Sequence, residues 1–203
     1  MNKPTAYDTT QAAGEFEPIK LGGHKMVIKQ ISEKKTQGGL DMLVILFDFA
    51  EGDEQAGYFM KQFENDIRPD KKYPNAGTNY MVIDEGVDYG VRNLKTFITC
   101  VEKSNPGFAV KWGDNFGQQF KGKLIGGIFR LEKDWYDNKE VKRHKLAWFR
   151  SVEGIKDADI PEERTTKAYD DHLKEEAIMG ANPAGPDGFM NIPDGIDEEL
   201  PFN

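Results

Sequence analysis

The sequence predicts a mainly β domain of five strands, with one helix between the third and fourth strands and a flexible acidic tail at the C-terminus. Three observations predict it. Strand-like segments flank a single helical segment, turn residues separate the segments, and acidic residues are concentrated after residue 156. With 38% hydrophobic residues the chain can also build a core.

The first three strands are predicted from apolar, β-branched and aromatic runs. Residues His24 to Ile31 and Leu40 to Phe49 form two such runs, and the TQGG segment between them has glycines suited to a hairpin turn. After EGDEQAG, the side chains of Tyr58 to Glu64 alternate in character, which predicts the third strand.

A long connection from Asp66 to Gly86 follows, with room for a short strand at Tyr80 to Ile83. The helix is predicted from apolar residues at steps of three and four, and it ends before the Asn105-Pro106-Gly107 segment. The apolar residues are Val87, Val91, Leu94, Ile98 and Val101. Lys121 to Lys133 and Glu140 to Val152 are the last two strands, joined by DWYDN.

This order of elements is that of the oligonucleotide-binding (OB) fold, a five-stranded barrel with a helix between strands 3 and 4. OB folds bind oligonucleotides on the strand 2 to 3 face and with the loops after strands 1 and 4. An unrelated α+β domain can share the same linear order, so the order alone does not distinguish the two.

The sequence divides into four parts. Residues 1–18 are expected to form a flexible arm, residues 19–156 the OB domain, and residues 157–180 a possible helix from Pro161 to Met179. The segment GANPAGPDG, residues 180–188, is dense in Pro and Gly, and residues 181–203 are expected to be a disordered linker and a tail that binds partner proteins.

The charge is distributed unevenly along the chain. The formal net charge is −8, yet residues 1–156 hold 24 basic residues against 22 acidic ones, whereas residues 157–203 hold 3 against 13. Residues 121–150 alone hold nine basic residues against four acidic ones. Such asymmetry is typical of proteins that contact nucleic acids.

Cysteine content and hydropathy indicate the compartment. The single cysteine, Cys100, cannot form an intrachain disulfide, and the N-terminus lacks a signal-peptide pattern. The longest apolar run, Met42 to Ala50, contains Asp48 and is too short to cross a bilayer. A soluble protein of a reducing, cytoplasmic compartment is therefore expected.

Aromatic and basic residues occur together in the third strand and in the last hairpin. Single strands are held by cations along the phosphates and by aromatic rings that stack on bases. The residues expected to bind DNA are Tyr58, Lys61, Phe63, Lys121, Lys123, Arg130, Lys133, Trp135, Tyr136, Lys142, Arg143, Lys145, Trp148 and Arg150.

The alternative for strand aromatics is core packing, which applies most to Phe59, Phe129, Trp148 and Phe149. Trp135 and Tyr136 are better candidates for stacking, since a turn flanked by charges is hard to bury. Strict alternation places Lys142, His144, Leu146, Trp148 and Arg150 on one face of the last strand.

The chain ends in DEELPFN. DEELPF resembles the acidic tip of bacterial single-stranded DNA-binding proteins, in which a final Phe enters an apolar pocket on partner proteins. The resemblance implies partner binding by Asp197, Glu198, Glu199, Leu200, Pro201 and Phe202. Asn203 departs from the family, which usually ends on Phe. A merely solubilising tail is the alternative, although it would not need an exposed Leu-Pro-Phe.

The segments VEKSNPGF, FKGKLIGG and GFMNIPDGIDEELPF are similar to the single-stranded DNA-binding proteins of phages and prophages of Gram-positive bacteria. That resemblance spans most of residues 15–203. It implies homo-oligomers, single-stranded DNA and replication or recombination proteins as partners, and the cytoplasm of a bacterial host cell.

The sequence gives little support for a phosphate-binding loop, a metal site or a reactive cysteine. Gly117 to Lys123 approaches the phosphate-binding G-x-x-x-x-G-K pattern, but Leu124 replaces the Ser or Thr that binds Mg²⁺, and a strand follows instead of a helix. The histidines are far apart, so no zinc spacing exists, and no metal or cofactor is expected. Cys100 is expected to be a structural thiol.

The sequence therefore predicts a non-enzymatic protein that binds and protects single-stranded DNA with little sequence preference during replication or recombination. Its tail is expected to recruit partner proteins. The alternative is a protein-interaction adaptor of a replication complex that does not itself bind DNA. A nuclease is a third possibility, but the sequence shows no assembled acid cluster.

Overall fold

The structure is a computed structural model that describes residues 2–5, 7 and 17–180. The predicted linker and partner-binding tail, including Asp197 to Phe202, lie outside these residues, as does most of the predicted arm. The elements are β1 (Gly22–Lys35), β2 (Asp41–Phe49), α1 (Tyr58–Asn65), β3 (Thr78–Val82), α2 (Gly90–Ser104), β4 (Leu124–Tyr136), β5 (Lys139–Arg150), β6 (Arg164–Thr165) and α3 (Lys167–Gly180), with short 3₁₀ helices η1 (Asn75–Gly77), η2 (Phe116–Phe120) and η3 (Glu153–Ile155).

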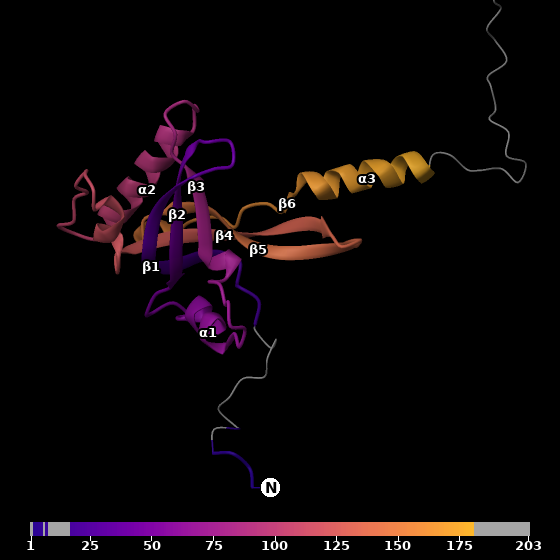
Figure 1. The fold of residues 1–203 in the computed structure, drawn as a ribbon, viewed down its shortest axis with the longest axis horizontal. Helices are drawn as coiled ribbons and strands as arrows, with labels where there is room; N and C mark the ends of the chain where they lie inside the picture. Colours follow the sequence, from indigo (N-terminus) through magenta and orange to yellow (C-terminus); the bar gives the residue numbers. More distant parts are fainter. Residues whose placement is uncertain (1, 6, 8–16, 181–203) are drawn as a thin grey trace, which may run out of the picture.

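The molecule is mainly β. Its main sheet has the strand order β3-β2-β1-β4-β5 with every neighbouring pair antiparallel, and the short β6 adds to β4 in parallel. Among the described residues, no ladder joins β3 to β5, so the sheet is not closed. The order is consistent with an OB-like fold, with α2 between β3 and β4 as predicted. Figure 1 shows α2 at one end of the sheet and the β4–β5 hairpin projecting away from it.

The core lies inside the curved sheet. Met26 and Ile28 of β1 and Phe47 of β2 are fully buried because alternate side chains of a strand point to the same face. A bulge in β1 between Ile28 and Gln30 shifts the alternation, so that Ile31 also reaches the core.

The predicted third strand, Tyr58 to Glu64, is wrong: these residues form helix α1. Gly57 precedes the helix and has no side chain with which to cap it. Asp48, at the end of β2, does so instead: its carboxyl group accepts hydrogen bonds from the backbone N–H groups of Phe59 (2.9 Å) and Met60 (3.3 Å). This cap comes from a residue distant in sequence, which a local pattern cannot reveal.

The third strand is instead β3, close to the short strand predicted at Tyr80 to Ile83. The predicted helix is confirmed as α2, which ends before Asn105. Its buried face is shifted, however: Phe97 and Cys100 are buried, whereas Val91 is 53% exposed. The predicted placement of Val91 on the buried face is therefore wrong.

The turn of the last hairpin is shorter than predicted. Trp135 and Tyr136 are the final residues of β4, not part of a turn, and Asp137 and Asn138 form a two-residue turn with φ of 54° and 56°. Two successive positive φ values are typical of a type I′ turn, which matches the twist of the paired strands.

A bulge in β5 corrects the predicted face. Ile128 pairs with Trp148 and Phe129 with Leu146, so Ala147 is an extra residue. Leu146 and Phe149 both contact the core, while Trp148 and Arg150 are exposed. Lys142, His144 and Leu146 therefore do not share a face with Trp148 and Arg150.

Helix α3 (Lys167–Gly180) overlaps most of the helix predicted from Pro161 to Met179, but it begins six residues later and ends one residue later. It packs against β4 near the hairpin tip (Figure 1). In the part of the chain that the structure describes, no helix has the length and apolar character needed to span a membrane.

Candidate nucleic-acid interface

The open edge between β3 and β5 carries two neighbouring pockets. The first lies between η1 and residues 142–145 of β5, and the second between β3 and residues 146–149 of β5. Residue numbers rise in the same direction along η1 and β3 on one side and along β5 on the other, so the two pockets lie one after the other along this edge. We call this edge the β3–β5 seam. The rise per residue of a strand places Lys142 and Trp148 roughly 20 Å apart along β5.

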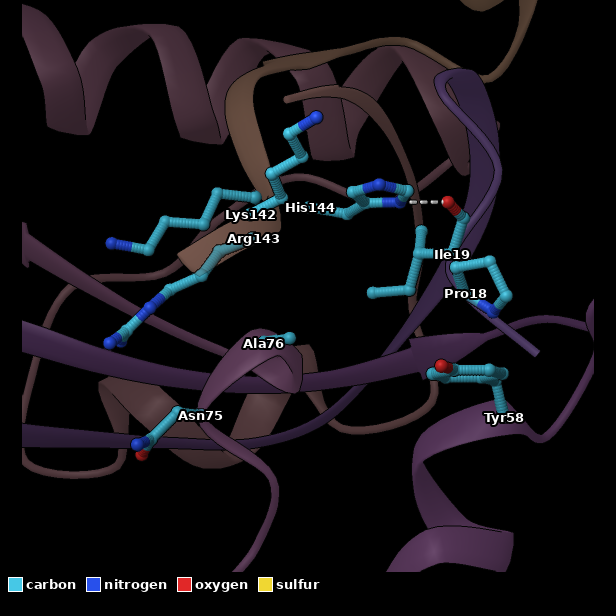
Figure 2. A pocket seen from close by; sticks show the side chains of 9 residues that line it. Pro18, Ile19, Tyr58, Asn75, Ala76, Lys142, Arg143 and His144 are labelled. Carbon is cyan, nitrogen blue, oxygen red and sulfur yellow. Dashed lines mark hydrogen bonds between the residues drawn. The ribbon is translucent and has the colours of Figure 1, made fainter. Parts of the chain in front are cut away.

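We call the first pocket the cationic pocket. It has a volume of about 340 Å³, and none of its lining residues is acidic. Figure 2 shows Pro18, Ile19 and Tyr58 on one side and the basic residues of β5 on the other. Its lining residues are Pro18, Ile19, Tyr58, Asn75, Ala76, Lys142, Arg143, His144 and Lys145. The structure thus brings together four residues that the sequence predicts as DNA contacts: Tyr58, Lys142, Arg143 and Lys145.

Hydrogen bonds fix the apolar side of this pocket. The Tyr58 hydroxyl donates to the Glu17 carbonyl (2.6 Å), and the Gln55 side-chain amide donates to the Pro18 carbonyl (3.0 Å). His144 Nδ1 donates to the Ile19 carbonyl, the bond that is dashed in Figure 2. Burial raises the pKa of Tyr58, which further disfavours the phenolate form that could not donate this hydrogen bond.

The cations of the pocket have acidic partners outside it. Lys142 Nζ lies 3.7 Å from Glu140, Arg143 Nη2 lies 3.1 Å from Asp134, and Lys145 Nζ lies 2.6 Å from Glu132. These cations are 40–59% exposed, and ion pairs at such exposure contribute at most about 1 kcal/mol. A phosphate can therefore compete for them.

We call the second pocket the aromatic pocket. It has a volume of about 330 Å³ and is lined by Asn79, Tyr80, Met81, Val82, Tyr89, Arg92, Asn93, Thr96, Leu146, Ala147, Trp148 and Phe149. Three of its rings are exposed: Tyr80 (60%), Tyr89 (51%) and Trp148 (37%). None of its lining residues is acidic. The Arg150 guanidinium lies over the Trp148 ring, 5.5 Å from its centroid.

The other predicted DNA contacts are scattered. Lys61 and Phe63 are on α1, with Lys71 Nζ over the Phe63 ring at 4.8 Å. Lys121 is exposed after η2, and Lys123 Nζ lies 4.6 Å from the Phe108 ring centroid. None of these residues lines either pocket.

The remaining predicted contacts lie on β4. Lys133 pairs with Glu163 at 2.5 Å, and Arg130 Nε is buried without a hydrogen-bond partner among the described residues. Trp135 stacks on His172 of α3, while Tyr136 is 64% exposed with Arg143 over its ring. Of the aromatics with two interpretations, Phe59, Phe129 and Phe149 are buried, which confirms core packing for them.

Four residues that line the pockets of the seam were not among the DNA contacts predicted from the sequence. They are Tyr80, Tyr89, Arg92 and His144. The position of Tyr80 in a predicted strand was a usable signal. Nothing in the local pattern indicates that Tyr89 and Arg92, at the start of α2, meet Trp148 across the seam.

Other chemistry is sparse in the described part of the chain. It contains no group of three or more His, Cys, Asp or Glu side chains that could hold a metal ion. Cys100 is buried, and burial raises the pKa of its thiol, which lowers the fraction present as the reactive thiolate.

Comparisons with known proteins give little. No protein-family model matches the chain, and no curated protein matches it. Among solved structures, the chain is similar to one titled "Yeast RPA bound to ssDNA", with 12% sequence identity over 89% of this chain and 97% of that chain and a TM-score of 0.23.

Proposed function

We propose that this chain is a non-enzymatic protein that binds single-stranded DNA with little sequence preference, and that its sheet is an OB barrel open between β3 and β5. One observation supports this most: Tyr58 from α1 and Lys142, Arg143 and Lys145 from β5 line one pocket without an acidic residue. Cations that follow the phosphates and rings that accept bases are what a sequence-tolerant single-strand site needs.

The proposed binding is electrostatic along the backbone. Bound phosphates release counterions, so affinity falls as salt rises, with a slope of about −0.7 per phosphate contact for single strands. The pocket rim offers three cations. Removing two of them should weaken binding and flatten the salt dependence.

The test is a titration of the full chain with fluorescently labelled oligo-dT over a salt series. The double variant Lys142→Ala, Arg143→Ala should bind more weakly, and its salt slope should fall by about 0.7 for each phosphate contact removed. Lys111→Ala, an exposed lysine that lines neither pocket, is the control and should match the wild type. A wild-type protein that does not bind oligo-dT at low salt would refute the proposal and leave the adaptor alternative.

The DEELPF tail belongs to the same proposal through its resemblance to the acidic tip of bacterial single-stranded DNA-binding proteins. It would recruit replication or recombination proteins in the cytoplasm of a bacterial host, during phage or prophage DNA metabolism. Removing residues 197–203 should leave oligo-dT affinity equal or higher, because the acids compete with phosphates for cations, and should abolish partner capture. A truncated protein that lost DNA binding would contradict this division of roles.

A further inference from the structure

The aromatic pocket combines three exposed aromatic rings, whereas the cationic pocket is lined by one tyrosine, Tyr58. Its exposed rings come from three separate elements: Tyr80 from β3, Tyr89 from the start of α2 and Trp148 from β5. Exposed aromatic side chains that gather at one hollow usually mark a binding site. The pocket floor includes Met81, Leu146 and Phe149, which contact the core, so the floor is apolar.

Two arginines, Arg92 and Arg150, lie at this pocket without an ion pair among the described residues. Arg92 lines it and is exposed, and no acidic group lies within 4.0 Å of its guanidinium among the described residues. Arg150 lies over Trp148 and has no acidic partner in the same part of the chain. The cations of the cationic pocket, by contrast, all have such partners.

An apolar floor, exposed rings and unpaired arginines are complementary to a nucleobase attached to a phosphate. An acidic peptide with an apolar side chain shares part of this chemistry, but three rings at one hollow favour a flat aromatic ligand. Bases have such a face whatever their sequence.

We propose that the aromatic pocket is a base-stacking site of the same bound single strand, in which Trp148 and Tyr80 stack on bases while Arg92 contacts a phosphate. This inference rests on the proposed function and adds a path: the strand follows the β3–β5 seam from Tyr58 to Arg92. A run of roughly 20 Å accommodates several nucleotides and agrees with the site sizes of about 4 to 16 nucleotides seen for OB folds.

Two probes separate stacking from charge in the full-length protein. Oligo-dT carries bases and phosphates, while an abasic oligodeoxynucleotide of the same length carries only the backbone. Tyr80→Ala and Trp148→Ala should each weaken oligo-dT binding about five- to 150-fold, because stacking contributes about 1 to 3 kcal/mol per base. Both variants should bind the abasic strand like the wild type, whereas Arg92→Ala should weaken binding of both probes.

Trp112→Ala is the matched control. Trp112 is 70% exposed and stacks on Phe116, 5.2 Å between centroids, outside both pockets. Its loss should leave both affinities unchanged. Because the Tyr80 side chain is exposed, Tyr80→Ala should fold like the wild type, and circular dichroism checks this.

A direct readout comes from a protein in which Trp148 is the only tryptophan, made with Trp112→Phe and Trp135→Phe. Oligo-dT should quench its fluorescence, and the abasic strand should not. If Tyr80→Ala and Trp148→Ala bind oligo-dT like the wild type while Lys142→Ala, Arg143→Ala is weakened, the base site is refuted and the proposed function survives. If the wild type binds neither probe, the proposed function itself fails.

Discussion

His172 of α3 lies flat against Trp135 of β4, with ring centroids 3.4 Å apart and an interplanar angle of 11°. The stack is part of a set of contacts that hold α3 to the hairpin. The Thr166 hydroxyl donates to Asp134 (2.7 Å), and the Tyr169 hydroxyl donates to Glu140 (2.9 Å). One face of Trp135 is therefore occupied by the chain itself.

Replacing His172 with Ala should loosen α3 from the hairpin, because a stacked ring pair contributes about 0.5 to 1.5 kcal/mol beyond its buried area. Hydrogen exchange of the α3 amides measures this, and they should exchange faster. His172→Phe keeps a ring and is the control that should retain most protection. Equal exchange in His172→Ala and the wild type would show that the stack does not hold the helix.

The same stack predicts how Trp135 responds to DNA. In a protein whose only tryptophan is Trp135, oligo-dT should change the emission little, because His172 occupies one ring face. The change should grow when His172→Ala is added. A strong quench in the presence of His172 would instead support the sequence-based assignment of Trp135 to base stacking, which stays a prediction.

Asp48→Ala should destabilise the fold by about 1 to 3 kcal/mol, since it leaves the buried N–H groups at the start of α1 without an acceptor. Asp48 is 1% exposed and bonds the N–H groups of Phe49, Phe59 and Met60. Asp48→Asn keeps one acceptor oxygen and should lose less. Denaturant unfolding measures both variants, and equal losses would argue against the capping role.

Gly90→Ala should also destabilise the protein, by about 1 to 3 kcal/mol, because the added methyl group forces a backbone shift. A Cβ at Gly90 would lie 2.1 Å from the Asp84 carbonyl oxygen. Gly38→Ala is the control, since the nearest atom to its Cβ would be Thr36 Oγ1 at 3.9 Å. Thermal unfolding should separate the two, and a near-wild-type Gly90→Ala would contradict the close approach.

Asp53 should contribute to the acid sensitivity of the protein. Burial alone would raise the pKa of Asp53, but hydrogen bonds from His24 and from the N–H groups of Gln55 and Lys25 outweigh it and lower the pKa. A carboxyl group whose pKa is lowered by folding stabilises the protein fully above its unfolded pKa of about 3.9, and this is lost as the pH falls through the folded pKa.

The corresponding variant is Asp53→Asn. Its deficit in unfolding free energy relative to the wild type should be largest near neutral pH and should shrink below about pH 4. Urea unfolding at a series of pH values measures the difference. A deficit that stays constant down to the acid transition would assign the effect of the substitution to packing instead.

The sequence by itself determined those elements whose signals are local. The apolar runs give β1 and β2, the three-and-four spacing around Leu94 and Ile98 gives α2, and two long strands around a short turn give the β4–β5 hairpin. Each of these patterns lies within one short stretch of sequence, so it can be recognised without knowing which other segments pack against that stretch.

Only the tertiary structure decided the rest. The segment after Gly57 alternates like a strand, but the Asp48 side chain and the burial of Phe59 make it a helix. The bulge at Ala147 separates Trp148 from His144, and α3 brings His172 onto Trp135.

The candidate site has the same origin, because Tyr58 and Lys142 meet in one pocket although 84 positions separate them. Hydrogen bonds and packing between distant segments set these arrangements. A pattern that spans a few residues carries no information about such partners.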